Sequence, residues 1–295
     1  AGADSSNGEP RRRLVSARRL LIVGATGLLG PYLVAEGRSR GAIVDTLGRT
    51  HGGVARDLTV PADLREVLNL SRYDAVVNAV ALTDVDACER DPDLAFAVNA
   101  GIVESLVAGL ATATHLVQVS TDQVYPDEPG PHLEERTAPV NAYGRSKLAG
   151  EAAALEHGRT TVLRTNFFGT SLTPGRESLS DWAIGALERG EALTGFTGSL
   201  FSPLRLDTVA RWCIDVIDAE LVGTFNLGST QGMSKYDFIL ELARARGLDA
   251  SAVRPVDAHT APGRAPRAGD LRLDVGLIEA RTGTRLASLV EEMAP

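Results

Sequence analysis

Short apolar runs alternate with longer segments of mixed polarity from residue 19 to residue 165. The apolar runs cover residues 19–23, 42–47, 74–81, 115–120 and 160–165. The segments between them have the apolar spacing of helices at 28–38, 61–70, 92–112 and 142–157. Nearly continuous apolar strands separated by helices are typical of a parallel sheet with both faces covered. The pattern therefore predicts a doubly wound α/β fold, in which ligands bind beyond the carboxyl ends of the strands.

The pattern changes after residue 166. Residues 176–190, 207–220 and 234–246 predict helices, and residues 224–228 predict a short strand. We therefore expect a second, smaller domain that is interleaved with the first.

The first residues of the chain predict a flexible tail, because residues 1–17 are polar, charged and without periodicity. The arginines at 11–13 precede an apolar run, as they would in a signal peptide. Glycines and Pro31 interrupt that run well before it reaches the length that a membrane span needs.

Composition narrows the class of protein. The chain has 295 residues, of which 44% are apolar and 23% are charged, as in globular proteins. A formal net charge of −8 disfavours nucleic acid or an anionic membrane as the main partner. Cys88 and Cys213 lie outside any CxxC motif, which argues against a disulfide scaffold and favours a reducing, cytoplasmic location. The five histidines have no HxH or HExxH spacing, so we expect no metal centre.

A glycine-rich turn connects the first predicted strand to the first predicted helix. It reads GATGLLG from Gly24 to Gly30, a GxxGxxG spacing instead of the GxGxxG of the usual dinucleotide-binding turn. Glycines let the backbone turn tightly and approach a pyrophosphate, which the N-terminus of the following helix attracts. The turn therefore predicts a dinucleotide cofactor. Its predicted cofactor-binding residues are Gly24, Thr26, Gly27, Leu28 and Leu29.

The end of the second predicted strand indicates which dinucleotide is bound. An acidic residue there would bind the ribose 2′-hydroxyl of NAD, whereas an arginine accommodates the 2′-phosphate of NADP. The sequence has Arg49 there, after Gly48, and no acidic residue at the strand tip. Arg49 therefore predicts NADP(H), the alternative being a solvated surface arginine. Asp57 and Leu58 are further cofactor-binding candidates, beside the adenine.

Two segments carry candidate catalytic groups. The apolar run at 115–120 leads into Ser120 and Thr121, and Tyr143 and Lys147 share one face of the helix predicted at 142–157. We expect the ammonium to lower the pKa of the phenol from about 10 towards neutral pH. Such a tyrosine can give a proton to a carbonyl oxygen as hydride reaches the carbon, while Ser120 or Thr121 orients that oxygen. A YxxxK spacing also arises by chance on surface helices.

The distribution of lysine sharpens this hypothesis. Lysine occurs only at positions 147 and 235, and the other 28 of the 30 basic residues are arginine. The wide, planar guanidinium of arginine is a poor substitute for a compact ammonium. A lysine at the position where this chemistry requires an ammonium therefore favours a catalytic role.

Three motifs, GATGLLG, STDQVY and NAYGRSK, together resemble the extended short-chain dehydrogenase/reductase superfamily. The resemblance covers about residues 18–290 and is greatest to dTDP-4-dehydrorhamnose reductases and related nucleotide-sugar 4-ketoreductases. It implies that Tyr143 is the catalytic acid, that Lys147 tunes it, and that Ser120 and Thr121 bind the substrate carbonyl. It also implies cofactor contacts at Ala79, Val80, Ala81 and Asn99, and at Tyr143 and Lys147, the latter at the nicotinamide ribose. The implied substrate contacts are Asp122, Gln123, Asn166, Phe201 and Arg267. For Arg267, a purely surface role stays open.

Gln123 distinguishes the chain from sugar-nucleotide 4,6-dehydratases, which it otherwise resembles. Those enzymes have Asp then Glu where this chain has Asp122 and Gln123, and a glutamine side chain cannot act as the base that dehydration needs. The sequence therefore disfavours dehydration. Leu204 stands where the related reductases often have threonine, so the sugar specificity stays open.

The sequence thus predicts NADPH-dependent reduction of the 4-keto group of a nucleotide-activated, dTDP-linked 6-deoxyhexose, with Tyr143 as proton donor. Two alternatives stay open, a sugar-nucleotide epimerase with tightly bound NAD and a non-catalytic NADP-binding regulatory subunit. The expected partner is the nucleotide sugar, and a homodimer is left open. The predicted organisation is a tail at 1–17, an NADP-binding Rossmann domain at 18–168 with about 205–230, and a substrate domain at about 169–204 and 231–295.

Overall fold

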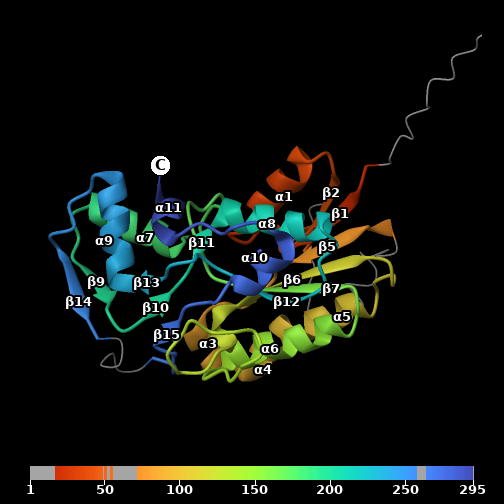
Figure 1. Ribbon diagram of the computed structural model, residues 1–295, viewed down its shortest axis with the longest axis horizontal. Helices are drawn as coiled ribbons and strands as arrows, with labels where there is room; N and C mark the ends of the chain where they lie inside the picture. The colour runs from red at the N-terminus through yellow and green to blue at the C-terminus, as the bar shows by residue number, and fades with distance from the viewer. Residues whose placement is uncertain (1–16, 49, 52–53, 56–71, 258–263, 295) are drawn as a thin grey trace, which may run out of the picture.

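A six-stranded parallel sheet forms the centre of the larger part of the molecule (Figure 1). The structure is a computed structural model that describes residues 17–48, 50–51, 54–55, 72–257 and 264–294. The strand order is β2–β1–β5–β6–β7–β12, and every neighbouring pair is parallel. The bounds are β1 Arg19–Val23, β2 Ile43–Leu47, β5 Ala75–Asn78, β6 His115–Thr121, β7 Thr160–Thr165 and β12 Gly223–Leu227. All five apolar runs became strands of this sheet, which confirms the predicted parallel sheet.

Helices cover both faces of the sheet, as a doubly wound fold requires. α1 (Gly30–Ser39) and α8 (Leu206–Asp218) lie on one face, and α5 (Ile102–Val107) and α6 (Ala142–Leu155) lie on the other (Figure 1). The predicted fold class is therefore confirmed.

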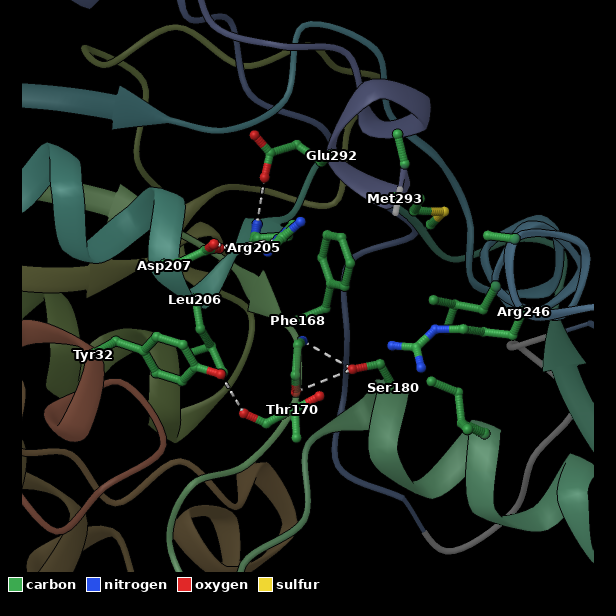
Figure 2. A pocket seen from close by; sticks show the side chains of 15 residues that line it. Tyr32, Phe168, Thr170, Ser180, Arg205, Leu206, Asp207, Arg246, Glu292 and Met293 are labelled. Atoms are coloured by element: carbon green, nitrogen blue, oxygen red, sulfur yellow. Dashed lines mark hydrogen bonds and ion pairs between the residues drawn. The ribbon is translucent and has the colours of Figure 1, made fainter. Parts of the chain in front are cut away.

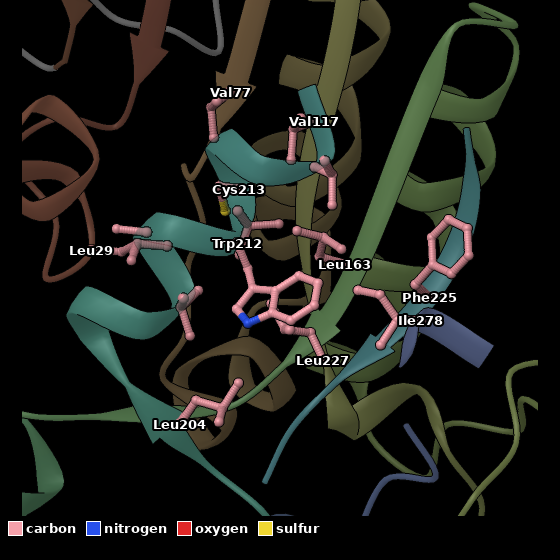
Figure 3. Close-up of a cluster of buried hydrophobic side chains, with 14 of the residues drawn as sticks. Leu29, Val77, Val117, Leu163, Leu204, Trp212, Cys213, Phe225, Leu227 and Ile278 are labelled. Carbon is pink, nitrogen blue, oxygen red and sulfur yellow. The ribbon is translucent and has the colours of Figure 1, made fainter. Parts of the chain in front are cut away.

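Apolar packing holds α8 against the sheet. Trp212 and Cys213 of this helix are buried over Val77, Val117 and Leu163, which come from three neighbouring strands (Figure 3). Burying an apolar side chain of this size contributes about 1.5–3 kcal/mol relative to leaving it exposed. The face of the sheet that carries α8 is therefore fixed by several such contacts.

The strand order places the candidate site. β2 lies on one side of β1 and β5 lies on the other, so the order reverses at β1. Open α/β sheets bind ligands in the crevice beyond the carboxyl ends of the strands at this point. Because β1, β5 and β6 are parallel, the residues that follow each of them meet at that edge.

Predicted helices differ from the observed ones by up to three residues at their ends, and one predicted helix is divided. α1 begins at Gly30 instead of residue 28, because the residues before it form the glycine-rich turn. The helix predicted at 92–112 is divided into α4 (Pro92–Phe96), a π-helical turn (Ala97–Gly101) and α5, which ends at Val107. A short helix that the pattern did not predict, α3 (Val85–Arg90), precedes them. The helix predicted at 61–70 lies outside the described residues.

The remaining segments form a smaller group at one end of the molecule (Figure 1). Its helices are α7 (Leu179–Glu188), α9 (Lys235–Arg246) and α11 (Leu289–Met293), and they share one hydrophobic cluster. The strands are β8 Phe167–Phe168, β9 Leu193–Phe196, β10 Leu200–Phe201, β11 Leu204–Arg205, β13 Met233–Ser234, β14 Val253–Val256 and β15 Asp270–Leu271. The other short elements are β3 Thr50–His51, β4 Val54–Ala55 and α10 Gly276–Thr282. The chain enters this group after β7 and returns to the large sheet at α8 and β12.

Candidate active site

The glycine-rich turn has no room for side chains at two of its glycines. Gly24 has a φ of +91°, and a Cβ there would lie 2.9 Å from the backbone of Ala79 and Val80. A Cβ on Gly30 would lie 2.4 Å from the backbone of Ala25. Glycine at these positions therefore lets β1, the turn and the end of β5 approach closely.

The N-terminus of α1 has the properties of a phosphate-binding site. The side chain of its N-cap residue, Leu29, makes no capping hydrogen bond, and its first turn contains no acidic residue. The first N–H groups of a helix lack partners within the helix, and its dipole favours an anion there. The Gly27 N–H donates to the Gly24 carbonyl at 2.9 Å, which closes the turn, and Thr26 is exposed on it. Leu29 is buried in the core, and Leu28 packs against that core.

Residues at the end of β5 lie next to this turn. Ala79, Val80 and Ala81 are half-buried, and the Ala79 N–H donates to the Val23 carbonyl at 2.9 Å. The predicted cofactor contacts of β1 and β5 therefore share one edge of the sheet. Three further predicted cofactor residues, Arg49, Asp57 and Leu58, lie outside the described residues.

Asn99 connects three segments around the site. It lies in the π-helical turn, a feature that often marks functional sites. Its side-chain oxygen accepts from the Leu82 N–H at 2.8 Å, and its side-chain nitrogen donates to the Ser146 hydroxyl of α6 at 2.9 Å. Asn99 thus joins the loop after β5 to α6.

β6 and α6 bring three predicted catalytic residues together. Tyr143 and Lys147 are both buried on α6, four residues apart. The Lys147 ammonium donates to the Val119 carbonyl at 2.7 Å, so this side chain lies against the end of β6. Thr121, the last residue of β6, makes a side-chain hydrogen bond with the Tyr143 hydroxyl.

The pKa of Tyr143 is raised, so the predicted lowering of this pKa is wrong. Burial is the main cause because it disfavours the phenolate, and Asp122 acts in the same direction, against the hydrogen bond with Thr121. Burial lowers the pKa of Lys147 to about 8, and Glu151 partly opposes this effect. At neutral pH the site therefore holds a neutral phenol and an ammonium on one helix face.

Ser120 and Thr121 belong to different networks. The Ser120 hydroxyl donates to Glu151, which forms an ion pair with Arg164 at 2.7 Å. The side chains of Arg164 and Glu151 are only 6% and 3% exposed. Both partners lie on α6, where Glu151 comes eight residues after Tyr143. Thr121 therefore contacts Tyr143, whereas Ser120 supports the buried ion pair.

Three predicted substrate residues lie around Thr121. The buried Asp122 carboxylate accepts from the Asn166 amide at 2.8 Å and from the Thr121 hydroxyl at 3.1 Å. Burial raises the pKa of Asp122, and these hydrogen bonds oppose the rise. The Gln123 side-chain oxygen accepts from the Asn141 amide at 3.2 Å, next to the start of α6.

Phe201 lies in the hydrophobic cluster of the smaller group, and Arg267 lies beside α3. Phe201 is 2% exposed and packs edge-on against Phe238, with ring centres 5.2 Å apart. Arg267 forms an ion pair with Asp86 of α3 at 2.9 Å, and its hydrogen bond lowers the pKa of Asp86 to about 2. Arg267 is therefore held in place by α3 and is not a free surface arginine.

Comparison with known proteins identifies the family. Residues 18–294 match the family model described as the RmlD substrate binding domain. The chain belongs to this family. It is 30% identical to a probable low-salt glycan biosynthesis reductase of Haloferax volcanii, over 92% of this chain and 95% of the relative. It is 32% identical to the dTDP-4-dehydrorhamnose reductase of Mycobacterium tuberculosis, over 85% of this chain and 83% of the relative.

Solved structures share the fold of this RmlD-family chain. A dTDP-4-dehydrorhamnose reductase from Clostridium acetobutylicum has a TM-score of 0.84 and 26% identity, covering 93% of this chain and 96% of its own. The Bacillus anthracis dTDP-4-dehydrorhamnose reductase in complex with NADP also has a TM-score of 0.84, with 22% identity over 94% and 98% of the two chains. These findings confirm the resemblance that the three sequence motifs indicated.

Two side chains of the RmlD-family site were absent from the sequence-based prediction. Glu151 pairs with Arg164 and contacts Ser120, and Lys235 lies within electrostatic reach of Asp122. The sequence contained an indication of both residues. Glu151 continues the four-residue spacing of Tyr143 and Lys147 along α6, and Lys235 is the second of only two lysines.

A separate cavity of about 430 Å³ lies elsewhere in the molecule (Figure 2). Tyr32, Ser180, Arg205 and Glu292 are among its lining residues, and none of the predicted catalytic residues lines it.

Within the described ranges, no group of three or more His, Cys, Asp or Glu side chains is arranged to hold a metal ion. In the same ranges, no helix has the length and apolar character to cross a membrane.

Proposed function

We propose that this protein is an NADPH-dependent reductase of the 4-keto group of a dTDP-linked 6-deoxyhexose. The observation that carries the proposal is the group formed by Thr121, Tyr143 and Lys147 at the carboxyl edge of the sheet that also carries the glycine-rich turn. The names of the two relatives support the reaction class, because one is a glycan biosynthesis reductase and the other a dTDP-4-dehydrorhamnose reductase.

The turn at 24–30 and the N-terminus of α1 would hold the pyrophosphate of the cofactor. Both positions fit this group, since no Cβ fills the turn at Gly24 and the first turn of α1 contains no acidic residue. Ala79, Val80, Ala81 and Asn99 would complete the binding site from β5 and the π-helical turn. Arg49 would bind the 2′-phosphate of NADP, and the Bacillus anthracis relative was solved with NADP. When bound, NADPH supplies the hydride that reduces the carbonyl carbon.

Tyr143 donates the proton to the carbonyl oxygen. Its raised pKa keeps the phenol protonated at neutral pH, so the proton is available before the reaction. The Thr121 hydroxyl orients the same oxygen. With a pKa of about 8, Lys147 is mainly charged at neutral pH and stabilises the tyrosinate that is left after the transfer.

We assign the hexose and its diphosphate to the side of the site formed by Asp122, Gln123, Asn166 and Arg267, with Phe201 supporting it from the core. We also propose that the chain divides as its sequence suggests, with residues 18–168 and about 205–230 binding the cofactor. Residues of about 169–204 and 231–295 would then bind the substrate.

The decisive test measures NADPH consumption with a dTDP-4-keto-6-deoxyhexose generated in situ. We expect wild type to turn over and Tyr143→Phe to lose about 10²–10⁴-fold in kcat, because general acid catalysis supplies a factor of that size. NADPH affinity should stay within twofold in the variant. Tyr32→Phe is the matched control, since the Tyr32 hydroxyl donates to the Thr170 carbonyl beside the separate cavity.

Other results would change the assignment. Full turnover by Tyr143→Phe would exclude this residue as the proton donor. NAD that stays bound through purification would support the epimerase alternative. NADPH binding by wild type without reduction of any keto-sugar would support the regulatory alternative.

A further inference from the structure

Both lysines of the chain lie at the candidate site. Lys147 is on α6, and Lys235 is the first residue of α9, on the opposite side. β13 pairs with β10 immediately before α9, with Ser234 opposite Leu200. The Lys235 N–H also donates to the Ser199 carbonyl at 3.0 Å. The start of α9 is therefore fixed by backbone contacts.

The Lys235 side chain lies over Phe201 and within electrostatic reach of Asp122, which follows β6. Its ammonium lies 5.9 Å from the centre of the Phe201 ring, within the range of a cation–π contact. The charges that act on it come from Asp122, which is the strongest, and from Arg264 and Arg267. Burial lowers the pKa of Lys235, and Asp122 opposes this change. Across the described part of the chain, the ammonium makes no hydrogen bond or salt bridge, so its three N–H donors are available to a ligand.

Asp122 is the acidic residue with the strongest electrostatic effect on this ammonium. It is 1% exposed and accepts a hydrogen bond from Thr121, which in turn contacts Tyr143. Asp122 therefore lies beside the group that we assign to the reacting carbonyl, and the Lys235 ammonium is within electrostatic reach of Asp122. Such a pair can accept from one hydroxyl and donate to another, which is how a carbohydrate ring is held in one orientation.

We propose that Lys235 binds the hexose ring of the substrate by donating a hydrogen bond to a hydroxyl near the reduced carbon, and thereby determines sugar specificity. This inference rests on the proposed function. Asp122 favours a sugar hydroxyl over the diphosphate as the partner, because a hydroxyl can accept from Lys235 and donate to Asp122, whereas a diphosphate oxygen can only accept. The diphosphate would then lie nearer the guanidinium groups of Arg264 and Arg267.

The test compares binding of dTDP with binding of dTDP-glucose, which carries a hexose but no ketone, by calorimetry on the NADP⁺-loaded protein. In Lys235→Met we expect about tenfold or greater loss of dTDP-glucose affinity, as for a lost hydrogen bond to a charged group. Affinity for dTDP should stay within twofold. With the keto-sugar, KM should rise by a similar factor while kcat changes less than threefold.

The matched control is Arg244→Met, which removes an exposed cation from the same helix and should change neither affinity. Lys235→Gln provides a second variant if Lys235→Met does not fold. Equal losses for dTDP and dTDP-glucose would overturn the proposal in favour of a diphosphate contact, and no loss for either would overturn it entirely. Wild type that binds dTDP-glucose but reduces no keto-sugar would instead contradict the proposed function, so the two failures are distinguishable.

Discussion

Two walls of the candidate site are built differently. The sheet-edge wall consists of residues 24–30, 79–82, 119–122 and 141–151, and each segment adjoins a strand of the parallel sheet or forms α6. The far wall consists of residues 166–168, 200–201, 233–235 and 264–271, and its strands are two residues long. Within the sheet-edge wall the parallel sheet determines which segments meet. In the far wall, the partners are set by packing between segments that are far apart in the sequence.

Side-chain contacts show the same difference. In the sheet-edge wall, Lys147 reaches the Val119 carbonyl of the strand on which α6 packs. In the far wall, Arg267 pairs with Asp86, which is 181 residues away in the sequence. Short sequence motifs therefore predict the part of the site that regular strands position. They do not predict the part that is assembled from segments far apart in the sequence.

The largest expected effect comes from breaking the buried ion pair behind the sheet-edge wall. Glu151→Ala leaves the Arg164 guanidinium buried without a counter-charge, which should lower the free energy of unfolding by about 3–5 kcal/mol. Urea denaturation measures this loss. Glu191→Ala removes the partner of the exposed Arg189 and should leave the midpoint unchanged. Similar urea midpoints for the two variants would show that the buried ion pair contributes no more to stability than the exposed one.

A smaller effect is expected from filling the glycine-rich turn. Gly30→Ala places a Cβ 2.4 Å from the Ala25 backbone and should lower stability by about 1–3 kcal/mol, as overpacking does. It should also weaken NADPH binding, because the backbone of the turn must shift. Gly185→Ala is the control. Gly185 lies inside α7, and a Cβ there would meet only the flexible end of the Arg189 side chain. That change should stabilise by about 0.5–1 kcal/mol, and thermal unfolding with NADPH titration distinguishes the two outcomes.

The smallest expected effect is a pH dependence of kcat/KM that arises from the titration of Lys147. Because its pKa is lowered to about 8, the ammonium is lost above that pH instead of above its ordinary value. The kcat/KM for NADPH should therefore be level below pH 8 and fall about tenfold per unit well above it, since loss of one required proton has that slope. Lys147→Met should have low activity without this dependence. A wild-type profile that stays level to pH 10 would contradict a required ammonium.

The sequence identified most of the sheet-edge wall. Apolar runs predicted five strands, and the glycine spacing predicted the turn, because both depend on residues close together in the chain. The YxxxK spacing placed Tyr143 and Lys147 on one helix face for the same reason. The pattern did not predict the π-helical turn that contains Asn99. The side chain of Asn99 forms hydrogen bonds with Leu82 and Ser146, which belong to separate segments of the chain.

The sequence by itself determined which groups are available for chemistry, because residue types and short spacings specify a turn, a strand end and a helix face. The tertiary structure decided their electrostatics. Burial raised the pKa of Tyr143 where its spacing from Lys147 had predicted a lowering, and desolvation depends on everything that packs over a group. It also decided that Lys235 lies within electrostatic reach of Asp122, since β13 pairs with β10 immediately before α9 and the two residues are far apart in the sequence.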